Sequence, residues 1–296
     1  MAEPLSIDDD PRVTPARSDL AAKHLEHRVK AARYVEGKMR KVVAPAAPVR
    51  HEPRHDALMD TEALKGELVT VYETTDEGWS WAQLAFDKYV GWLPTDALGE
   101  VGERATHRVA TVRTLVFPAP SIRISPLEAL SFGCELAIAR IDPPFAITAA
   151  NEFVPLRHLV EQHHRERDFV EVAERFLGAP YLWGGKTGLG LDCSALVQLS
   201  LRSCGLSCWR DSDMQEQSFQ PIVDPASDFS NLRRGDLIFW DGHVAIVRDN
   251  ETLIHANGHH MAVAIEPIAE AVARNRAQGA EISSIRRLEE LARPAQ

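Results

Sequence analysis

Residues 176–202 read FLGAPYLWGGKTGLGLDCSALVQLSLR, and the organisation of the chain follows from this stretch. A turn signal, Gly-Ala-Pro at 178–180, precedes two aromatic residues, a glycine-rich loop and the sequence Asp-Cys-Ser at 192–194. From Leu196 onward apolar residues recur at helical spacing, which predicts a helix that begins near Cys193. Partial positive charge and free N–H groups at a helix N-terminus favour a thiolate and suit an oxyanion beside it.

Cys193 has two interpretations at this point, a nucleophile or a small buried residue that packs one turn of a helix. The other cysteines, Cys134, Cys204 and Cys208, form no paired CxxC pattern and no dense framework. Neither a zinc ribbon nor a disulfide scaffold is therefore indicated, and we predict no metal and no other cofactor.

The composition excludes some classes of partner. The chain has 296 residues, of which 43 are acidic and 33 basic, so its formal net charge is −10. This charge argues against nonspecific binding to nucleic acid and against docking on anionic membranes. The first residues, MAEPLSIDDDP, lack the basic and apolar regions of a secretory signal, and no apolar run reaches about 18 residues. We therefore expect a cytoplasmic protein with no nucleic-acid and no membrane partner.

The N-terminal half has the sequence pattern of small β domains. Apolar residues between Asp19 and Lys38 have helical spacing, so residues 1–40 are predicted to be a segment with a bracing helix. Short alternating runs broken by Pro and Gly predict one small all-β barrel over 41–104 and a second over 105–160. In the first barrel, strands are expected at Val42-Val43, Leu68–Tyr72, Trp79–Leu84 and Tyr89–Leu93. The second region repeats motifs of the first, since Glu-Ala-Leu at 62–64 recurs at 128–130.

Residues 161–296 are predicted to form an α+β domain. Its expected elements are a helix from 169 to 176, the Cys193 helix, and strands at 237–240, 243–247 and 253–256. A helix over 262–273 and a closing strand with a tail over 281–291 complete the prediction. The fold class is thus a cysteine-bearing helix packed on an antiparallel sheet.

Two histidines complete a candidate catalytic group. His243 begins one predicted strand and His255 lies in the next, so a hairpin could place both on one face. A thiol–imidazole pair would then use His243 to take the proton of Cys193 and return it to a leaving amine. His255 would orient the His243 ring by accepting a hydrogen bond from its other nitrogen. Each histidine taken singly is more simply read as a satisfied residue of the core or the sheet edge.

Several motifs resemble one family. They are Gly-x-Pro-Tyr-x-Trp-Gly-Gly at 178–185, Asp-Cys-Ser-x-Leu-Val at 192–197, Arg-Gly-Asp-Leu at 234–237, Gly-His-Val-x-Ile at 242–246 and Ile-His-Ala at 254–256. Together they resemble the NlpC family, papain-like cysteine peptidases that cut bacterial cell-wall peptides. The patterns Gly-Glu-x-Val and Tyr-Val-Gly-Trp-Leu make the region before residue 104 similar to bacterial SH3-like domains. Two such domains ahead of the peptidase resemble the γ-D-glutamyl-L-diamino-acid endopeptidase branch, which recycles murein peptides.

The resemblance implies roles for named positions. Cys193 matches the nucleophile, His243 the base and His255 the orienting third residue. Tyr181 matches a tyrosine whose hydroxyl lies near the oxyanion. Positions that line the substrate pocket in that branch match Trp183, Asp192, Ser194, Asp211 and Ser212. In the same branch the first SH3-like domain closes the cleft with an acidic residue and a tyrosine, for which Glu52 and Tyr89 are the nearest candidates.

The implied function is cleavage of L-Ala-γ-D-Glu-diamino-acid peptides after D-Glu, with Asp211 holding the free N-terminal ammonium. The diamino acid, diaminopimelate or lysine, is left open by the sequence. One alternative is another cysteine amidohydrolase or an acyltransferase on the same scaffold. A second is a binding protein that acts through its SH3-like domains and has an inactive peptidase domain.

Overall fold

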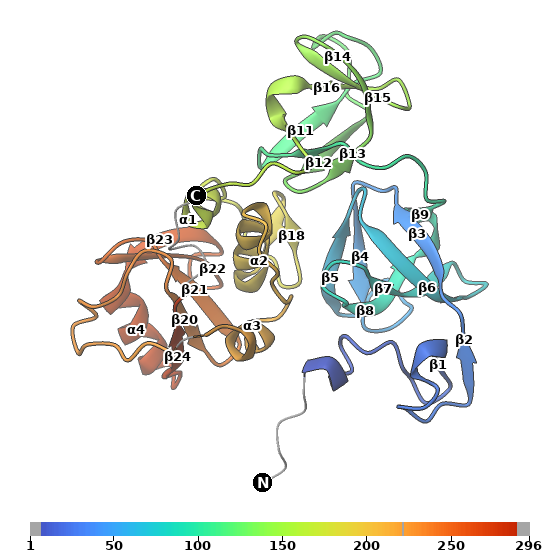
Figure 1. Ribbon diagram of the computed structural model, residues 1–296. Coiled ribbons are helices and arrows are strands. Elements are labelled where there is room, and N and C mark those ends of the chain that lie inside the picture. The colour runs from blue at the N-terminus through green and yellow to red at the C-terminus, as the bar shows by residue number, and fades with distance from the viewer. Residues whose placement is uncertain (1–6, 221, 289–296) are drawn as a thin grey trace. The chain divides into compact units, whose positions relative to one another are not determined.

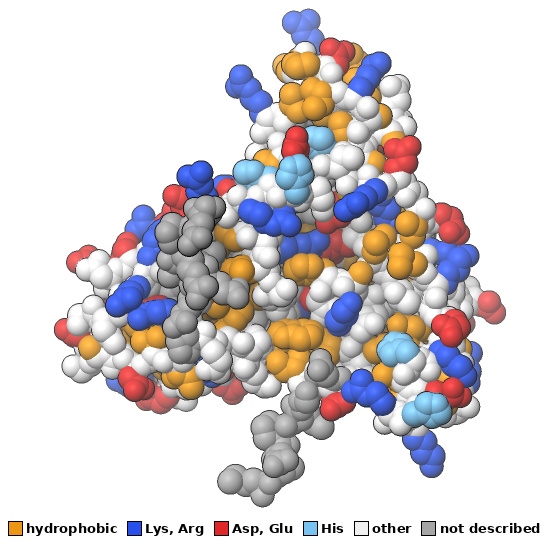
Figure 2. Space-filling view, in the orientation of Figure 1, with side chains coloured by type: hydrophobic (Ala, Val, Ile, Leu, Met, Phe, Trp, Pro, Cys, Tyr) orange, Lys and Arg blue, Asp and Glu red, His pale blue; other side chains and the backbone are white. Residues whose placement is uncertain are grey.

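The computed structural model describes residues 7–220 and 222–288, and the chain divides into two compact units, Met1–His163 and His164–Gln296 (Figure 1). Each unit has its own sheets and its own buried cores. Short 3-10 turns lie at Ile7–Asp9, Lys23–Leu25, Thr95–Ala97 and Leu156–His158. Among the described residues, no helix has the length and apolar character needed to cross a bilayer. Figure 2 shows basic and acidic side chains interspersed over the face that it draws.

A seven-stranded antiparallel sheet forms the first barrel. Its order is β5-β4-β8-β7-β6-β3-β9. The strands are β3 (Lys38–Val42), β4 (Ala46–Arg50), β5 (Met59–Leu64), β6 (Leu68–Thr74), β7 (Trp79–Leu84), β8 (Val90–Pro94) and β9 (Leu98–Gly99). The strands predicted around Leu68, Trp79 and Tyr89 are confirmed. Strands β4 and β5 were not predicted, because Pro48 interrupts one strand and polar residues fill much of the other.

The helix predicted between Asp19 and Lys38 is wrong. The segment instead forms β1 (Leu20–Ala22), a 3-10 turn and β2 (Arg33–Val35), and β1 pairs with β2 in parallel. Leu20 is fully buried in a cluster with three tryptophans of the barrel, Trp79, Trp81 and Trp92. Burying this leucine against aromatic rings favours an extended segment over the local helical preference.

The region from 105 to 163 is also all-β, in small separate sheets. Its strands are β10 (His107–Val109), β11 (Arg113–Val116), β12 (Glu128–Ser131), β13 (Glu135–Leu136), β14 (Ile138–Asp142), β15 (Phe145–Thr148), β16 (Phe153–Pro155) and β17 (Leu159–Glu161). They form sheets of order β13-β10-β17, β11-β12 and β14-β15-β16, around a core that includes Phe117, Phe145 and Phe153. Its assignment as a second SH3-like barrel stays a prediction.

The second unit is built on a five-stranded antiparallel sheet of order β23-β22-β21-β20-β24. The strands are β20 (Leu237–Trp240), β21 (His243–Val247), β22 (Thr252–Asn257), β23 (Ala262–Pro267) and β24 (Ile282–Arg286), with a separate hairpin of β18 (Lys186–Thr187) and β19 (Gly190–Leu191). The helices are α1 (Phe169–Glu174), α2 (Cys193–Ser203), α3 (Ser212–Ser218) and α4 (Ile268–Ala277). The α+β class, the Cys193 helix and the three strands from β20 to β22 are confirmed.

The helix predicted over 262–273 is wrong in its first half. Residues 262–267 form β23, which pairs with β22 along its whole length, and α4 begins only at Ile268. Alternating apolar residues at Val263 and Ile265 suit a strand once β22 offers a partner. The closing strand predicted over 281–291 is found as β24, and the part of the prediction from residue 289 lies outside the described residues.

Helices α2 and α4 lie on opposite sides of the five-stranded sheet (Figure 1). Helix α2 packs against β21 and β22, and Arg202 is its one residue that is not buried. Helix α4 buries Ile268, Ala271 and Val272 in the core cluster that contains Ala245 and Val247 of β21. A helix enclosed in this way has little freedom to move, so the residue that begins it, Cys193, is held firmly against the sheet.

Truncation of a core side chain in the first barrel should cost far more stability than truncation of an exposed one. Leu93 is completely buried in the barrel core, whereas Leu58 is 76% exposed. Leu93→Ala should lower the free energy of unfolding by about 2–5 kcal/mol, because it removes apolar contacts and leaves a cavity. Leu58→Ala should change it by less than about 0.5 kcal/mol. Urea denaturation of both variants measures the difference, and similar losses in both would contradict the assigned core.

Candidate active site

Cys193 is the first residue of α2, and the preceding residue caps the helix. The side chain of Asp192 accepts a hydrogen bond from the N–H of Ala195 at 2.8 Å, as an N-cap residue does. The backbone N–H groups of Val244 and Ser194 lie close enough to the sulfur of Cys193 to favour its charged form. The contact with Val244 places the thiol at the first residues of β21, where His243 begins the strand.

Burial raises the pKa of Cys193 by more than the helix N-terminus can lower it. Burial, and secondly the negative charge of Asp192, raise the pKa of the Cys193 thiol to about 12. The residue is 6% exposed, so the cost of burying a charged sulfur outweighs the nearby N–H groups and the helix N-terminus that favour a thiolate. The raised pKa favours a neutral thiol in the substrate-free protein, which is the form whose proton His243 is predicted to take.

The two imidazoles meet as predicted. Ile246 of β21 lies opposite Ile254 of β22, and this register puts His243 and His255 together on the other face of the sheet. Nε2 of His243 and Nδ1 of His255 are 2.8 Å apart, a hydrogen-bond distance. The indole of Trp240 packs beside the His243 ring, with 5.7 Å between the ring centroids. The side chain of His243 is thus fixed by a hydrogen bond and by ring packing.

Burial keeps His243 neutral. Its pKa is lowered to about 3, first by burial and then by the neighbouring His255. The pKa of His255 is lowered as well, chiefly by burial. Both rings are therefore uncharged near pH 7, and a neutral imidazole is the form that can accept a proton from a thiol.

Tyr181 offers a hydroxyl close enough to Cys193 for the charge of the sulfur to affect it. The residue bridges to Leu191, which lies directly before the cap of α2, and its N–H donates to the carbonyl of Met261 at 3.0 Å. The pKa of Tyr181 is raised to about 12 by burial, and secondly by the proximity of Cys193 and Asp192. The hydroxyl therefore stays protonated and available as a donor. Trp183 is 67% exposed on the loop that follows.

A buried ion pair, which the sequence analysis did not identify, anchors this loop. Arg210 is 1% exposed and binds both carboxylate oxygens of Asp192, at 2.7 and 2.9 Å. The same guanidinium donates to Ser194 Oγ at 2.9 Å and to the carbonyl of Gly185 at 3.3 Å. A bidentate pair of this kind fixes orientation as well as position. Arg210 thus connects the glycine-rich loop, the cap of α2 and the residue after the cysteine.

Asp192 and Ser194 direct their polar groups inward. The carboxylate of Asp192 also accepts hydrogen bonds from the N–H of Gly184 at 2.9 Å and from Ser194 Oγ at 3.1 Å. A side chain at Gly185 would place its Cβ 2.5 Å from the carbonyl oxygen of Gly190, so this position needs glycine. The role of Asp192 and Ser194 in the substrate pocket stays a prediction, and their internal role is to shape the loop.

The start of α3 lies next to this network. Asp211 and Ser212, half-buried, follow Arg210 directly and begin α3. Gln215, which the sequence did not identify, is fully buried and donates to the carbonyls of Ser194 at 3.0 Å and Trp209 at 2.9 Å. It connects α3 to the first turn of α2. The hydrogen bonds of Arg210 and Gln215 fix the backbone on either side of Asp211 and Ser212. The assignment of these two residues to the substrate pocket stays a prediction.

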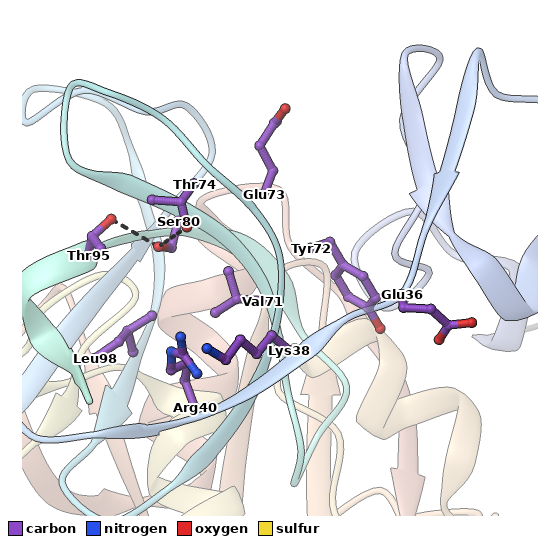
Figure 3. A pocket seen from close by; sticks show the side chains of 10 residues that line it. All are labelled: Glu36, Lys38, Arg40, Val71, Tyr72, Glu73, Thr74, Ser80, Thr95 and Leu98. Atoms are coloured by element: carbon purple, nitrogen blue, oxygen red, sulfur yellow. Dashed lines mark hydrogen bonds between the residues drawn. The ribbon is translucent and has the colours of Figure 1, made fainter. Parts of the chain in front are cut away.

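The two candidates from the first barrel have different surroundings. Tyr89 is 5% exposed and belongs to the core of the barrel, whereas Glu52 is exposed and pairs with Arg54 at 2.8 Å. Their assignment to the substrate cleft stays a prediction. The same barrel has a cavity of about 410 Å³ on another part of its surface (Figure 3). Its hydroxyl groups bond to one another, and Arg40 at its edge pairs with Glu100 at 3.1 Å.

Within residues 7–220 and 222–288, one group has the composition of a metal site. Ligand atoms of His255, His260 and Glu266 lie within 4.8 Å of one another. Both oxygens of Glu266 accept hydrogen bonds from Arg274, each at 2.5 Å, and a guanidinium in that position competes with a cation. The group is therefore better explained as a hydrogen-bond network. All four cysteines are free, and the described structure pairs none of them.

Loss of Arg210 should destabilise the second unit strongly. Arg210→Met leaves the Asp192 carboxylate buried without its partner, which should cost about 3–5 kcal/mol of unfolding free energy. Arg175→Met is the matched control, because Arg175 forms a similar pair with Glu166 at 2.9 Å but is partly exposed. The control should lose about 0–1 kcal/mol. Urea denaturation compares the two, and a loss in Arg210→Met no larger than the control would show that the buried pair does not stabilise the loop.

Comparisons with known proteins agree with this geometry. A model of the bacterial dipeptidyl-peptidase SH3 domain matches residues 49–98, and a model of the NlpC/P60 family matches residues 178–281. Dipeptidyl-peptidase 6 of Lysinibacillus sphaericus is 28% identical over 239 residues, covering 73% of this chain and 86% of the relative. A gamma-D-glutamyl-L-lysine dipeptidyl-peptidase of Bacillus cereus is 26% identical over 243 residues, covering 71% of each.

Among solved structures, an NlpC/P60 family protein from Bacillus cereus shares the fold, with a TM-score of 0.69 at 20% identity. The match covers 84% of this chain and 99% of that protein. The matched NlpC/P60 region contains Cys193, His243 and His255, and the helix and sheet that carry them have the arrangement of that fold. The chain thus combines a bacterial dipeptidyl-peptidase SH3 domain with a cysteine peptidase domain of the NlpC/P60 family.

Proposed function

We propose that this peptidase hydrolyses the bond between γ-D-Glu and the diamino acid in short murein peptides that carry a free N-terminal L-Ala. The observations that carry the proposal are the His243–His255 hydrogen bond and the position of Cys193 next to Val244, the residue that follows His243. Two relatives are named as dipeptidyl-peptidases, one of them as a gamma-D-glutamyl-L-lysine dipeptidyl-peptidase. We also propose that the substrates are fragments released during turnover of the cell wall and that the enzyme meets them in the cytoplasm.

The first chemical step starts from a neutral Cys193 thiol and a neutral His243 imidazole. As the substrate carbonyl reaches the sulfur, Nδ1 of His243 takes the thiol proton and the sulfur forms a bond to the carbonyl carbon. The electron pair of the carbonyl moves to its oxygen, which the Tyr181 hydroxyl and the N-terminal end of α2 stabilise. Coupling proton transfer to attack avoids a free thiolate, which the buried site disfavours.

The remaining steps release two products. The carbon–nitrogen bond breaks, and His243 gives its proton to the leaving amine of the diamino acid. Water then attacks the thioester carbon while His243 takes one of its protons. The carbon–sulfur bond breaks, L-Ala-D-Glu leaves as the second product, and His243 returns the proton to the Cys193 sulfur. His255 keeps the His243 ring in place during both transfers.

Selection of a free N-terminus would come from Asp211 and Ser212. These residues are half-buried at the start of α3, and their frame is fixed by Arg210 and Gln215. A carboxylate in a partly buried place binds an ammonium group more strongly than in water.

Product analysis tests the proposed cleavage. The enzyme should convert L-Ala-γ-D-Glu-diaminopimelate or its lysine analogue to L-Ala-D-Glu and the diamino acid, as identified by mass spectrometry. Cys193→Ala should show no turnover, because it lacks the sulfur, whereas the control Cys208→Ala should keep activity. N-acetylated tripeptides should react at least about tenfold more slowly, since they lack the ammonium. Equal rates with and without the acetyl group would contradict the ammonium site, and release of other products would point to a different amidohydrolase or an acyltransferase.

As the pH falls, kcat/KM should not show the decrease that protonation of a catalytic histidine usually causes. His243 must be neutral to act as a base, and burial lowers its pKa to about 3, so it stays neutral as the pH falls below 6.5. Activity at pH 5.5 should therefore remain within about twofold of that at pH 7, whereas an unperturbed histidine would lose about tenfold. Initial rates between pH 4.5 and 7.5 measure this, with circular dichroism to confirm folding at each pH. An acid limb near pH 6.5 would contradict a neutral, buried base.

A further inference from the structure

A second pair of charged residues lies behind His255. Nε2 of His255 is 2.7 Å from Oε1 of Glu266, and both side chains are almost completely buried. Arg274 of α4 binds the same carboxylate through both of its terminal nitrogens, each at 2.5 Å. A continuous chain of hydrogen bonds therefore runs from Arg274 through Glu266 and His255 to His243.

The strand register explains how Glu266 reaches this position. His255 lies opposite Ala264 on β23, and Glu266 is two residues further along the same strand. Residues two apart point to one face, so Glu266 is a diagonal neighbour of His255 on the face that His243 also shares. Arg274 comes from α4, which packs on this side of the sheet. A buried carboxylate in a strand is unusual unless it is paired, and here it has two partners.

The donor and acceptor in each of these hydrogen bonds can be assigned by starting from Arg274. Arg274 only donates, and it holds Glu266 in the ionised form, so the pKa of Glu266 lies well below its usual range. An ionised carboxylate only accepts, so Nε2 of His255 must carry the proton in that hydrogen bond. A neutral imidazole has one N–H, so Nδ1 of His255 is an acceptor and the N–H must belong to Nε2 of His243. Nδ1 of His243 is then left with its lone pair free.

We infer that Glu266, held by Arg274, is a positioning residue that fixes the tautomers of His255 and His243 so that Nδ1 of His243 can accept the Cys193 proton. The inference rests on the proposed function for the roles of Cys193 and His243, and it adds the group that sets the direction of the hydrogen bonds. With the opposite tautomers, Nδ1 of His243 would carry a hydrogen and could not act as the base.

His260 also lies near His255 but does not take over the role of Glu266. His260 is exposed, and its N–H and its ring nitrogen Nδ1 lie 2.8 and 3.0 Å from Oδ1 of Asn257. Its nearness to His255 lowers the pKa of that ring only as the last of several causes. Glu266 is thus the group that binds the far nitrogen of His255.

Glu266→Met tests the inference, because it removes the carboxylate that accepts from Nε2 of His255 and keeps a side chain of similar length. A buried N–H without an acceptor is costly, so the proton should leave Nε2 of His255 for Nδ1, where it can be donated to His243. Both tautomers should then reverse. Glu281→Met is the matched control, since Glu281 forms a 2.9 Å pair with Arg276 at the end of the same helix but is exposed.

Nitrogen-15 NMR of the histidine side chains reads the tautomers directly. In the wild-type protein both His255 and His243 should be protonated on Nε2, with signals assigned through His243→Gln and His255→Gln. In Glu266→Met both should shift to protonation on Nδ1, and in Glu281→Met neither should change. Wild-type protein in which Nδ1 of His255 carries the proton would overturn the inference, whether or not the variant folds.

The rate of Cys193 alkylation by iodoacetamide gives a second readout that needs no substrate. Glu266→Met should slow alkylation of Cys193 at pH 7 by at least about tenfold, because the base is lost, while Glu281→Met leaves it unchanged. With a cleaved peptide, kcat should fall by at least about tenfold at a KM within about twofold, as expected when a histidine base is held in the wrong tautomer. A folded Glu266→Met variant that alkylates at the wild-type rate would also overturn the inference. Failure of the wild-type enzyme to cleave any murein peptide would contradict the proposed function and leave the NMR and alkylation results to decide on Glu266.

Discussion

The carboxylate of Asp192 is the point on which the catalytic half of the molecule depends. It caps α2, accepts from the glycine-rich loop and pairs with a guanidinium that is 1% exposed. Such a pair is not a large source of net stability, because burying both charges costs nearly as much as their attraction returns. Its value is orientation: the loop, the helix and the start of α3 can meet in one way only if every donor around this carboxylate is satisfied. The position of the Cys193 sulfur follows from that constraint.

Local sequence predicted the parts of the site that are close together in the chain. The glycine-rich loop followed by Asp-Cys-Ser and an apolar helical pattern was sufficient to place Cys193 at the start of α2. The alternating apolar runs on either side of tight turns were sufficient to place His243 and His255 on neighbouring strands. These predictions held because turn chemistry and side-chain period act over a few residues.

The residues that escaped prediction depend on tertiary packing. Arg210 meets a partner 18 residues away, and Arg274 meets Glu266 across a strand end and a helix turn. In the sequence they are ordinary charged residues, and only packing buries Arg210 and Glu266. The false helix between Asp19 and Lys38 has the same origin, since the tryptophan cluster that receives Leu20 lies some 60 residues further along the chain. The raised pKa of Cys193 could not be predicted for a related reason: the helix N-terminus is visible in a sequence, whereas the extent of burial is not.

The neutral, enclosed thiol has a consequence for chemical durability. Peroxides attack the deprotonated sulfur of a cysteine and react slowly with the protonated form. A site that holds its sulfur as a thiol until a substrate carbonyl arrives is therefore guarded against conversion to sulfenic acid while it is idle. Peptidases that keep a permanent thiolate–imidazolium pair lack this protection. The burial that makes Cys193 a poor nucleophile at rest is, in oxidising surroundings, what preserves it.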